Sequence, residues 1–117
     1  AEGVILCALA EVYIKNMGSQ GRVKAAKQAT EAVGIFRQSS DQRMLAKSLV
    51  LQAKVSAANI DKNYSRTEWR YHEALSAVEI CQEALDISKG IGDRAGEASA
   101  LSLIAHCRVF GGLEDDW

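Results

Sequence analysis

The fold of this 117-residue chain is decided by residues 84–105, which read ALDISKGIGDRAGEASALSLIA. Its first part ends an apolar helical stripe, and Gly90 and Gly92 supply the backbone freedom that a helix needs where it stops. Asp93 is well suited to cap a following helix, because its carboxylate can accept the first unpaired amide hydrogens. The helical period then restarts with Ala98, Leu101 and Ala105. The stretch therefore predicts the end of one helix, a tight turn and the start of the next.

The same unit occurs twice in the chain. When the sequence is shifted by 52 positions, nine residues coincide without a gap. The identical pairs are Ala25/Ala77, Glu31/Glu83, Ala32/Ala84, Ile35/Ile87, Asp41/Asp93, Ala46/Ala98, Leu49/Leu101, Leu51/Leu103 and Ala53/Ala105. An ungapped match across a helix, a turn and a second helix indicates an internal repeat. We expect two of these pairs, Ala32/Ala84 and Ala53/Ala105, to lie at close contacts between helices.

Apolar periodicity predicts five helices joined by short loops. The first helix runs to about residue 16, and the others cover about 22–38, 41–59, 66–89 and 93–110. Loops are expected at residues 18–21 and 61–64, and the sequence S-R-T-E at 65–68 fits a capping box. No segment reads as a strand, and proline is absent. The prediction is an all-α fold of antiparallel helix pairs. It forms one repeat domain over residues 1–112, made of about 1–38, 41–89 and 93–110, before a short acidic tail at 113–117.

The cysteine pattern predicts buried thiols. Cys7, Cys81 and Cys107 each lie within an apolar helical pattern, and free cysteine packs as a small hydrophobic residue. We expect reduced thiols and hence an intracellular, reducing compartment. Neither His72 nor His106 has ligand spacing from a cysteine, so no metal and no cofactor are expected. No run approaches the roughly 18 consecutive apolar residues of a membrane span.

No sequence motif for catalysis stands out. The phosphate-binding, dinucleotide-binding, zinc-protease and nucleophile-elbow patterns are all missing from the sequence. The carboxylate pair Glu79/Glu83 is interpreted as part of a solvated helix face, and Asp115/Asp116 as part of the tail. The sequence therefore predicts a protein that is not an enzyme.

The helix pairs resemble the tetratricopeptide (TPR) repeat, a helical hairpin that stacks into an α-solenoid. Helix-A positions of the family are matched by Leu6, Leu9, Ala10, Tyr13, Leu49, Ala53, Leu101 and Ala105. Helix-B positions are matched by Ala25, Ala29, Ala32, Ala77, Cys81 and Ala84. The turn GDRAGEA at 92–98 is similar to that of long repeats such as those of kinesin light chains and rapsyn-like scaffolds. The resemblance covers nearly the whole chain, as about two and a half repeats.

Two features depart from the TPR pattern. Equivalent helix-A alanines are 43 residues apart (Ala10 to Ala53) and then 52 apart (Ala53 to Ala105), against about 34 in the standard repeat. The proline that closes a standard repeat is also missing. Helices and loops longer than those of the standard repeat are therefore expected.

The resemblance implies a concave groove as the binding surface. Its lining, carried over by register, is Glu11, Lys15, Lys47, Val50, Lys54, Ser99, Ser102 and His106. Lys47 and Lys54 lie two turns apart on one side of the third helix, so an acidic segment is the expected ligand, with Val50 taking an apolar side chain between the charges. The lysine–asparagine clamp of chaperone-binding TPRs is not reproduced, so the carboxyl terminus of a chaperone is not implied.

The sequence thus predicts a non-catalytic interaction scaffold with a protein partner. One alternative is an accessory subunit held in a large assembly through its open ends. Residues 1–60 carry a charge of +4 and the remainder −5, a distribution that favours head-to-tail packing or two different partners. A nucleic-acid-binding helical repeat is the second alternative. The net charge of −1 and pI near 6.1 argue against it, because such proteins carry a basic surplus.

Overall fold

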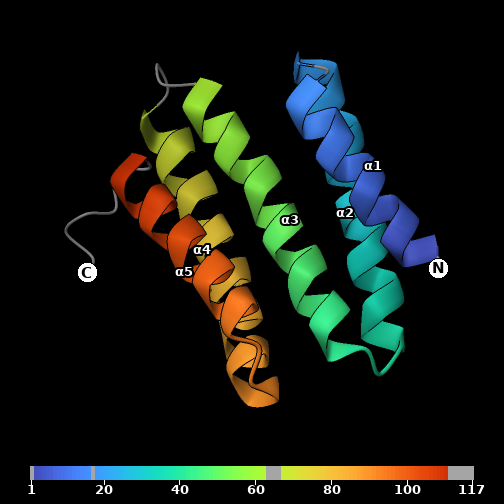
Figure 1. Ribbon diagram of the computed structural model, residues 1–117. Coiled ribbons are helices and arrows are strands. Elements are labelled where there is room, and N and C mark those ends of the chain that lie inside the picture. The colour runs from blue at the N-terminus through green and yellow to red at the C-terminus, as the bar shows by residue number, and fades with distance from the viewer. Residues whose placement is uncertain (1, 17, 63–66, 111–117) are drawn as a thin grey trace.

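Five helices follow one another in antiparallel order (Figure 1). The computed structural model describes the backbone of residues 2–16, 18–62 and 67–110, and the side chains of 2–14, 21–58 and 72–109. The helices are α1 (Glu2–Asn16), α2 (Gly18–Gln38), α3 (Gln42–Lys62), α4 (Thr67–Ile91) and α5 (Arg94–Phe110). No strand occurs among the described residues, which confirms the predicted all-α class. None of the described helices combines the length and the apolar character needed to cross a membrane.

The helix boundaries differ from the prediction in three places. Residues 18–21, predicted as a loop, form the first turn of α2. Glycine and serine are tolerated there, because the first amide groups of a helix have no partner within it. Residues 61 and 62 end α3 rather than opening a loop, and Gly90 continues α4 to Ile91. The predicted capping serine at 65 and the acidic tail at 113–117 lie outside the described residues.

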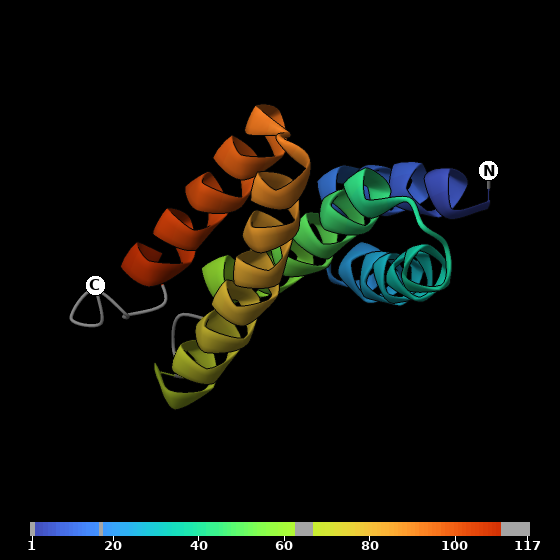
Figure 2. The ribbon, with the colours of Figure 1, turned by 90° about the horizontal axis from the view of Figure 1, so that it is seen from below.

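The helices form two layers (Figure 2). The first layer holds α1, α3 and α5, which run in the same direction, and the second holds α2 and α4. The central helix α3 packs against all four others. Within the second layer, Arg37 of α2 binds Glu83 of α4 through two hydrogen bonds of 2.7 and 2.8 Å. This arrangement leaves the outer face of the first layer open on both sides of α3.

The turn between α4 and α5 forms as the sequence predicts, and Gly92 lies at its centre. Gly92 has a φ of +72°, a conformation that glycine adopts without a steric penalty. Its amide donates to the carbonyl of Lys89 (3.3 Å), and the Asp93 amide donates to the carbonyl of Ser88 (2.9 Å). These two bonds form the Schellman motif that ends α4. Asp93 then caps α5, since its Oδ1 accepts the Gly96 amide at 3.1 Å.

Small residues let the helices approach one another closely. Ala32, Ala53 and Ala84 are fully buried, as expected for helix contacts. Their predicted companion Ala105 is only partly buried, which corrects the expectation for that position. In the same helix Ala98 is exposed and Leu101 is 52% exposed.

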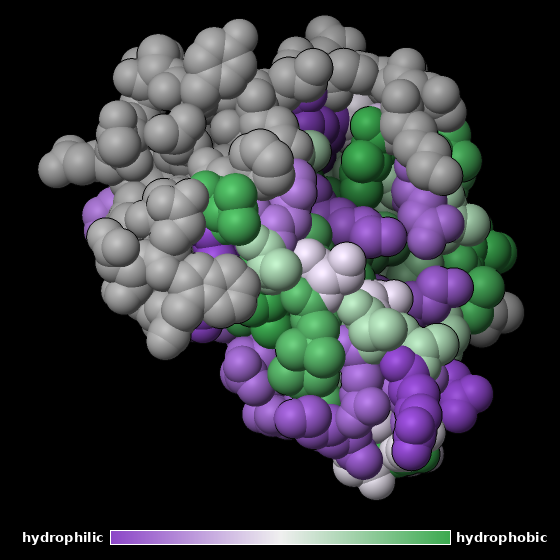
Figure 3. All heavy atoms as spheres, turned by 60° about the vertical axis from the view of Figure 1, so that its left-hand side comes forward, coloured by the Kyte–Doolittle hydropathy of each residue, from purple (hydrophilic) through white to green (hydrophobic). Residues whose placement is uncertain are grey.

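The sequence-based prediction that Ala98, Leu101 and Ala105 form the core-facing side of α5 is therefore wrong. The buried residues of α5 are Ala100, Ile104 and Cys107. The reason is that α5 packs on one side only, against α3 and α4, whereas α3 is enclosed by four helices. Figure 3 shows apolar residues gathered in the middle of the face on the side of α4 and α5.

Candidate functional site

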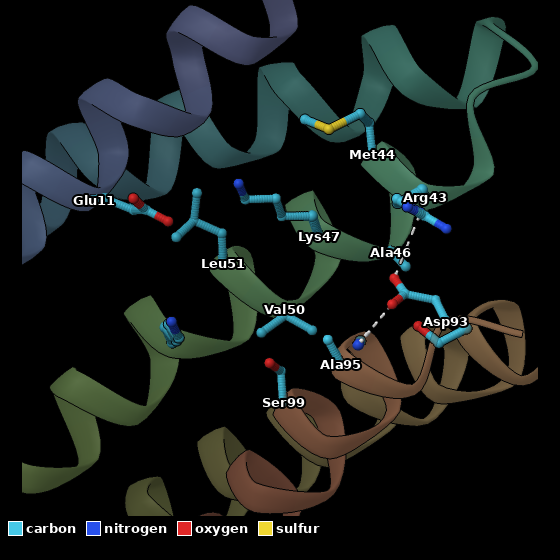
Figure 4. A pocket seen from close by; sticks show the side chains of 13 residues that line it. Glu11, Arg43, Met44, Ala46, Lys47, Val50, Leu51, Asp93, Ala95 and Ser99 are labelled. Atoms are coloured by element: carbon cyan, nitrogen blue, oxygen red, sulfur yellow. Dashed lines mark hydrogen bonds and ion pairs between the residues drawn. The ribbon is translucent and has the colours of Figure 1, made fainter.

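A pocket of about 410 Å³ opens on the first layer, between α1, α3 and α5 (Figure 4). Helix α3 contributes most of its lining. The lining residues are Glu11, Arg43, Met44, Ala46, Lys47, Val50, Leu51, Lys54, Ser88, Asp93, Ala95, Gly96 and Ser99. An apolar base formed by α3 is thus surrounded by charged and polar groups from four of the five helices and the α4–α5 turn.

A second pocket continues this surface toward the carboxyl ends of α3 and α5. It measures about 470 Å³ and is lined by Ile14, Lys54, Ala57, Ala58, Ser99, Ser102, Leu103 and His106. Lys54 and Ser99 line both pockets, so the two form one concave surface.

Seven of the eight sequence-predicted residues line this concave surface. They are Glu11, Lys47, Val50, Lys54, Ser99, Ser102 and His106. The backbone at Lys15 belongs to α1, but its side chain lies outside the described residues. The structure places the seven together, while their role in binding a partner stays a prediction.

Three cations lie on one face of α3. Arg43, Lys47 and Lys54 follow the spacing i, i+4 and i+11, which keeps them on the same side of a helix. All three are exposed, and between the two lysines Val50 is 8% exposed. Arg43 is engaged, because its Nε lies 3.8 Å from Oδ2 of Asp93. Among the described residues Lys47 and Lys54 take part in no ion pair, so the pocket presents two amines that are not bound to a carboxylate.

Glu11 supplies the opposing charge at the α1 side of the pocket. Figure 4 shows Glu11 of α1 and Lys47 of α3 reaching into the same space. Both act on the buried thiol of Cys7: burial raises its pKa most, Lys47 lowers it and Glu11 raises it. Both charged groups therefore lie close enough to Cys7 to change the pKa of its thiol. Any anionic ligand at Lys47 would be attracted by that amine and repelled by Glu11.

The α4–α5 turn forms the other end of the pocket. Asp93 holds its carboxylate between the Gly96 amide and Arg43, so it is occupied by structural bonds. Ser88 is fully buried, and its Oγ has no hydrogen-bond partner among the described residues. A Cβ on Gly96 would lie 2.6 Å from that oxygen, so only glycine fits at this position without a shift.

The pocket residues that the sequence analysis does not predict include Arg43, Ser88, Asp93 and Gly96. Arg43 carried a usable signal, because it lies one turn before Lys47 on the same helix face. Asp93 was predicted as a cap, and capping itself places it at the pocket edge. Ser88 and Gly96 carried no signal, since their contact depends on how the turn folds α5 back over α4.

The cysteines and histidines assemble no ion-binding cluster in the described part of the chain. Cys7, Cys81 and Cys107 are all buried, as predicted, and none forms a disulfide. Burial, with a smaller contribution from Cys107, raises the pKa of the Cys81 thiol to about 12.

Comparison with known proteins adds no relative. No protein-family model, no curated protein and no solved structure matches this chain.

Proposed function

We propose that this chain is a non-catalytic interaction module that holds an extended, acidic segment of a partner protein on its concave surface. The main support for this proposal is the arrangement of side chains on the outer face of α3. There Lys47 and Lys54 are exposed, form no ion pair with described residues, and flank the apolar side chain of Val50. An intracellular scaffold related to TPR proteins is part of the same proposal.

The spacing of the two amines defines the segment that fits. Lys54 follows Lys47 by seven positions in the helix, which is about 10 Å along the axis at 1.5 Å per residue. A peptide in the extended polyproline II conformation advances about 3.1 Å per residue with three residues per turn, so two carboxylates three residues apart lie on one side of the peptide and span nearly the same distance. An apolar residue between them would lie over Val50 and Leu51. The matching pattern is an acid, an apolar residue, a small residue and a second acid.

Electrostatic attraction favours an acidic segment, but its contribution to the affinity is limited. Exposed ion pairs contribute up to about 1 kcal/mol each, and salt screens charges beyond about 10 Å at 0.1 M. Most of the affinity must therefore come from both amines acting together with apolar contact in the pocket. Glu11 weakens the attraction, so Glu11→Gln is expected to strengthen binding of an acidic peptide.

A second candidate function uses the ends of the array rather than its concave surface. It is favoured by the exposed apolar residues of the first and last described helices, including Ile5 at 60% and Leu101 at 52% exposure. An accessory subunit of a larger assembly would bury these side chains against neighbours.

The concave-surface proposal is tested by fluorescence anisotropy with a short labelled peptide that contains Glu-Leu-Ala-Glu. Wild-type protein is expected to bind it, with an affinity that falls as salt rises. The double variant Lys47→Glu, Lys54→Glu is expected to bind at least about tenfold more weakly, a change of about 1.4 kcal/mol. Neither lysine belongs to the core, so the fold should be retained.

The matched control is Lys27→Glu with Lys89→Glu, which makes the same charge change on α2 and α4. This control should bind nearly as well as wild type. Equal loss in both variants would mean that bulk charge, and not the α3 face, attracts the peptide. Absence of binding to wild-type protein would contradict the proposal outright.

A further inference from the structure

Both ends of the helix array carry an apolar stripe on an open helix face. On α1, Ile5, Leu9 and Val12 are 60%, 39% and 51% exposed. On α5, Leu101 is 52% exposed, with Ala98 exposed and Ala105 partly buried beside it. Each set follows the i, i+3 or i+4 spacing of one helix side. We call these the α1 face and the α5 face.

The internal repeat identifies the α5 face as a packing surface. Its residues Ala98, Leu101 and Ala105 are identical to Ala46, Leu49 and Ala53 of α3 at the 52-residue shift. In α3 those three are 3%, 1% and 0% exposed, because α3 packs against all four other helices. The α5 face thus keeps the residues of a helix–helix contact, although none of the described helices covers Leu101 there.

The α1 face has the properties of a surface that could cover the α5 face. It presents large side chains, Ile5, Leu9 and Val12, where the α5 face presents two alanines around one leucine. Large residues of one helix fill the space left by small residues of the other, which is how packed helices interdigitate. The stripes also carry opposite charges at corresponding ends, with exposed Glu2 on α1 and exposed Arg94 on α5.

We propose that a second copy of this chain covers the α5 face with its α1 face, in a head-to-tail contact. Helices α1, α3 and α5 run in the same direction, so a copy added along the array lays its α1 parallel to α5. Glu2 then lies beside Arg94, since both are at the starts of their helices. The two faces differ, so the contact is heterologous and leaves one free face at each end of the dimer. It is separate from the concave surface and does not depend on the proposed function.

Sedimentation velocity over a series of protein concentrations tests this contact with the full chain. Wild-type protein is expected to show a concentration-dependent shift from monomer to dimer and longer species. Ile5→Lys blocks the α1 face and Leu101→Lys blocks the α5 face, and both positions are at least half exposed, so the fold is expected to persist. Each variant alone is expected to self-associate at least about tenfold more weakly. Val23→Lys, at a 72% exposed position on α2, is the control and should associate like wild type.

Mixing the two blocked variants gives the decisive result. Ile5→Lys keeps its α5 face and Leu101→Lys keeps its α1 face, so the mixture is expected to form dimers of one variant with the other and nothing larger. Wild-type protein that stays monomeric throughout would overturn the proposal. So would undiminished association of either single variant, which indicates a symmetric contact, or a mixture that remains monomeric.

Discussion

Asp41 and Asp93, 52 residues apart, make the same two hydrogen bonds at the starts of α3 and α5. Asp41 Oδ1 accepts the Met44 amide at 3.2 Å, and Asp93 Oδ1 accepts the Gly96 amide at 3.1 Å. Their main-chain carbonyls accept the amides of Leu45 and Glu97, each at 3.0 Å. The repeat in the sequence is thus also a repeat in local structure.

Removing either cap should destabilise the protein, and Asp93 more than Asp41. An N-cap change to alanine costs about 1 kcal/mol. Asp93→Ala also removes the contact with Arg43, and the Asp93 side chain is only 19% exposed. Urea unfolding should therefore show a larger loss for Asp93→Ala than for Asp41→Ala. Asp93→Asn, which keeps a capping oxygen, should lie close to wild type, and equal stability of Asp93→Ala and wild type would contradict the capping role.

The buried Ser88 hydroxyl and Gly96 form a coupled pair. Ser88→Ala removes an unpartnered buried polar group, so it should leave stability unchanged or raise it by about 1 kcal/mol. Gly96→Ala places a methyl group 2.6 Å from Ser88 Oγ and 2.8 Å from Asp93 Oδ2, and should destabilise by about 1 kcal/mol despite its better helix propensity. In the Ser88→Ala background part of that cost should disappear. Additive effects of the two changes in thermal unfolding would show that the contact is unimportant.

The Arg37–Glu83 pair should give a small pH dependence of stability in the acid range. The hydrogen bonds from Arg37 lower the pKa of Glu83. The unfolded chain therefore binds a proton before the native state does. The stabilisation is complete above the ordinary carboxyl pKa and is lost as the pH falls through the lowered pKa.

The size of that effect is limited by exposure. The side chains are 50% and 41% exposed, so solvent screening holds the coupling to about 0.5 kcal/mol. A double-mutant cycle with Arg37→Ala and Glu83→Ala at low salt measures it. Zero coupling at neutral pH, or coupling that grows on acidification, would count against the pair.

Thiol chemistry should report on unfolding. Because Cys81 is buried and its pKa is raised to about 12, its thiolate is scarce at neutral pH. Alkylation of the native protein at Cys81 should be slow and should accelerate when urea unfolds the chain. Rapid labelling of native Cys81, followed by mass spectrometry, would show that α4 and α5 separate readily.

The sequence predicts most of this fold because its strongest signals are local. The turn chemistry of Gly92 and Asp93 and the 3.6-residue apolar period depend on neighbours along the chain. The orientation of α5 depends instead on which helices surround it. Leu49 and Leu101 are identical and lie at equivalent positions, yet one is 1% and the other 52% exposed. Sequence identity between repeats cannot distinguish an inner helix from an outer one.

In the candidate site, too, only the features that depend on local sequence could be predicted. Lys47, Val50 and Lys54 were predictable, because the spacing within one helix fixes their common face. The approach of Ser88 to Gly96 was not, because it depends on the path of the turn between α4 and α5.

Zero-length cross-linking shows whether an acidic segment lies along the α3 face. A carbodiimide couples carboxylates only to amines in contact with them, so it can join the Glu-Leu-Ala-Glu peptide to particular lysines. Mass spectrometry then locates each new amide bond. We expect bonds at Lys47 and Lys54, which line the concave surface. Bonds confined to Lys24, Lys27 or Lys89, on α2 and α4, would contradict it.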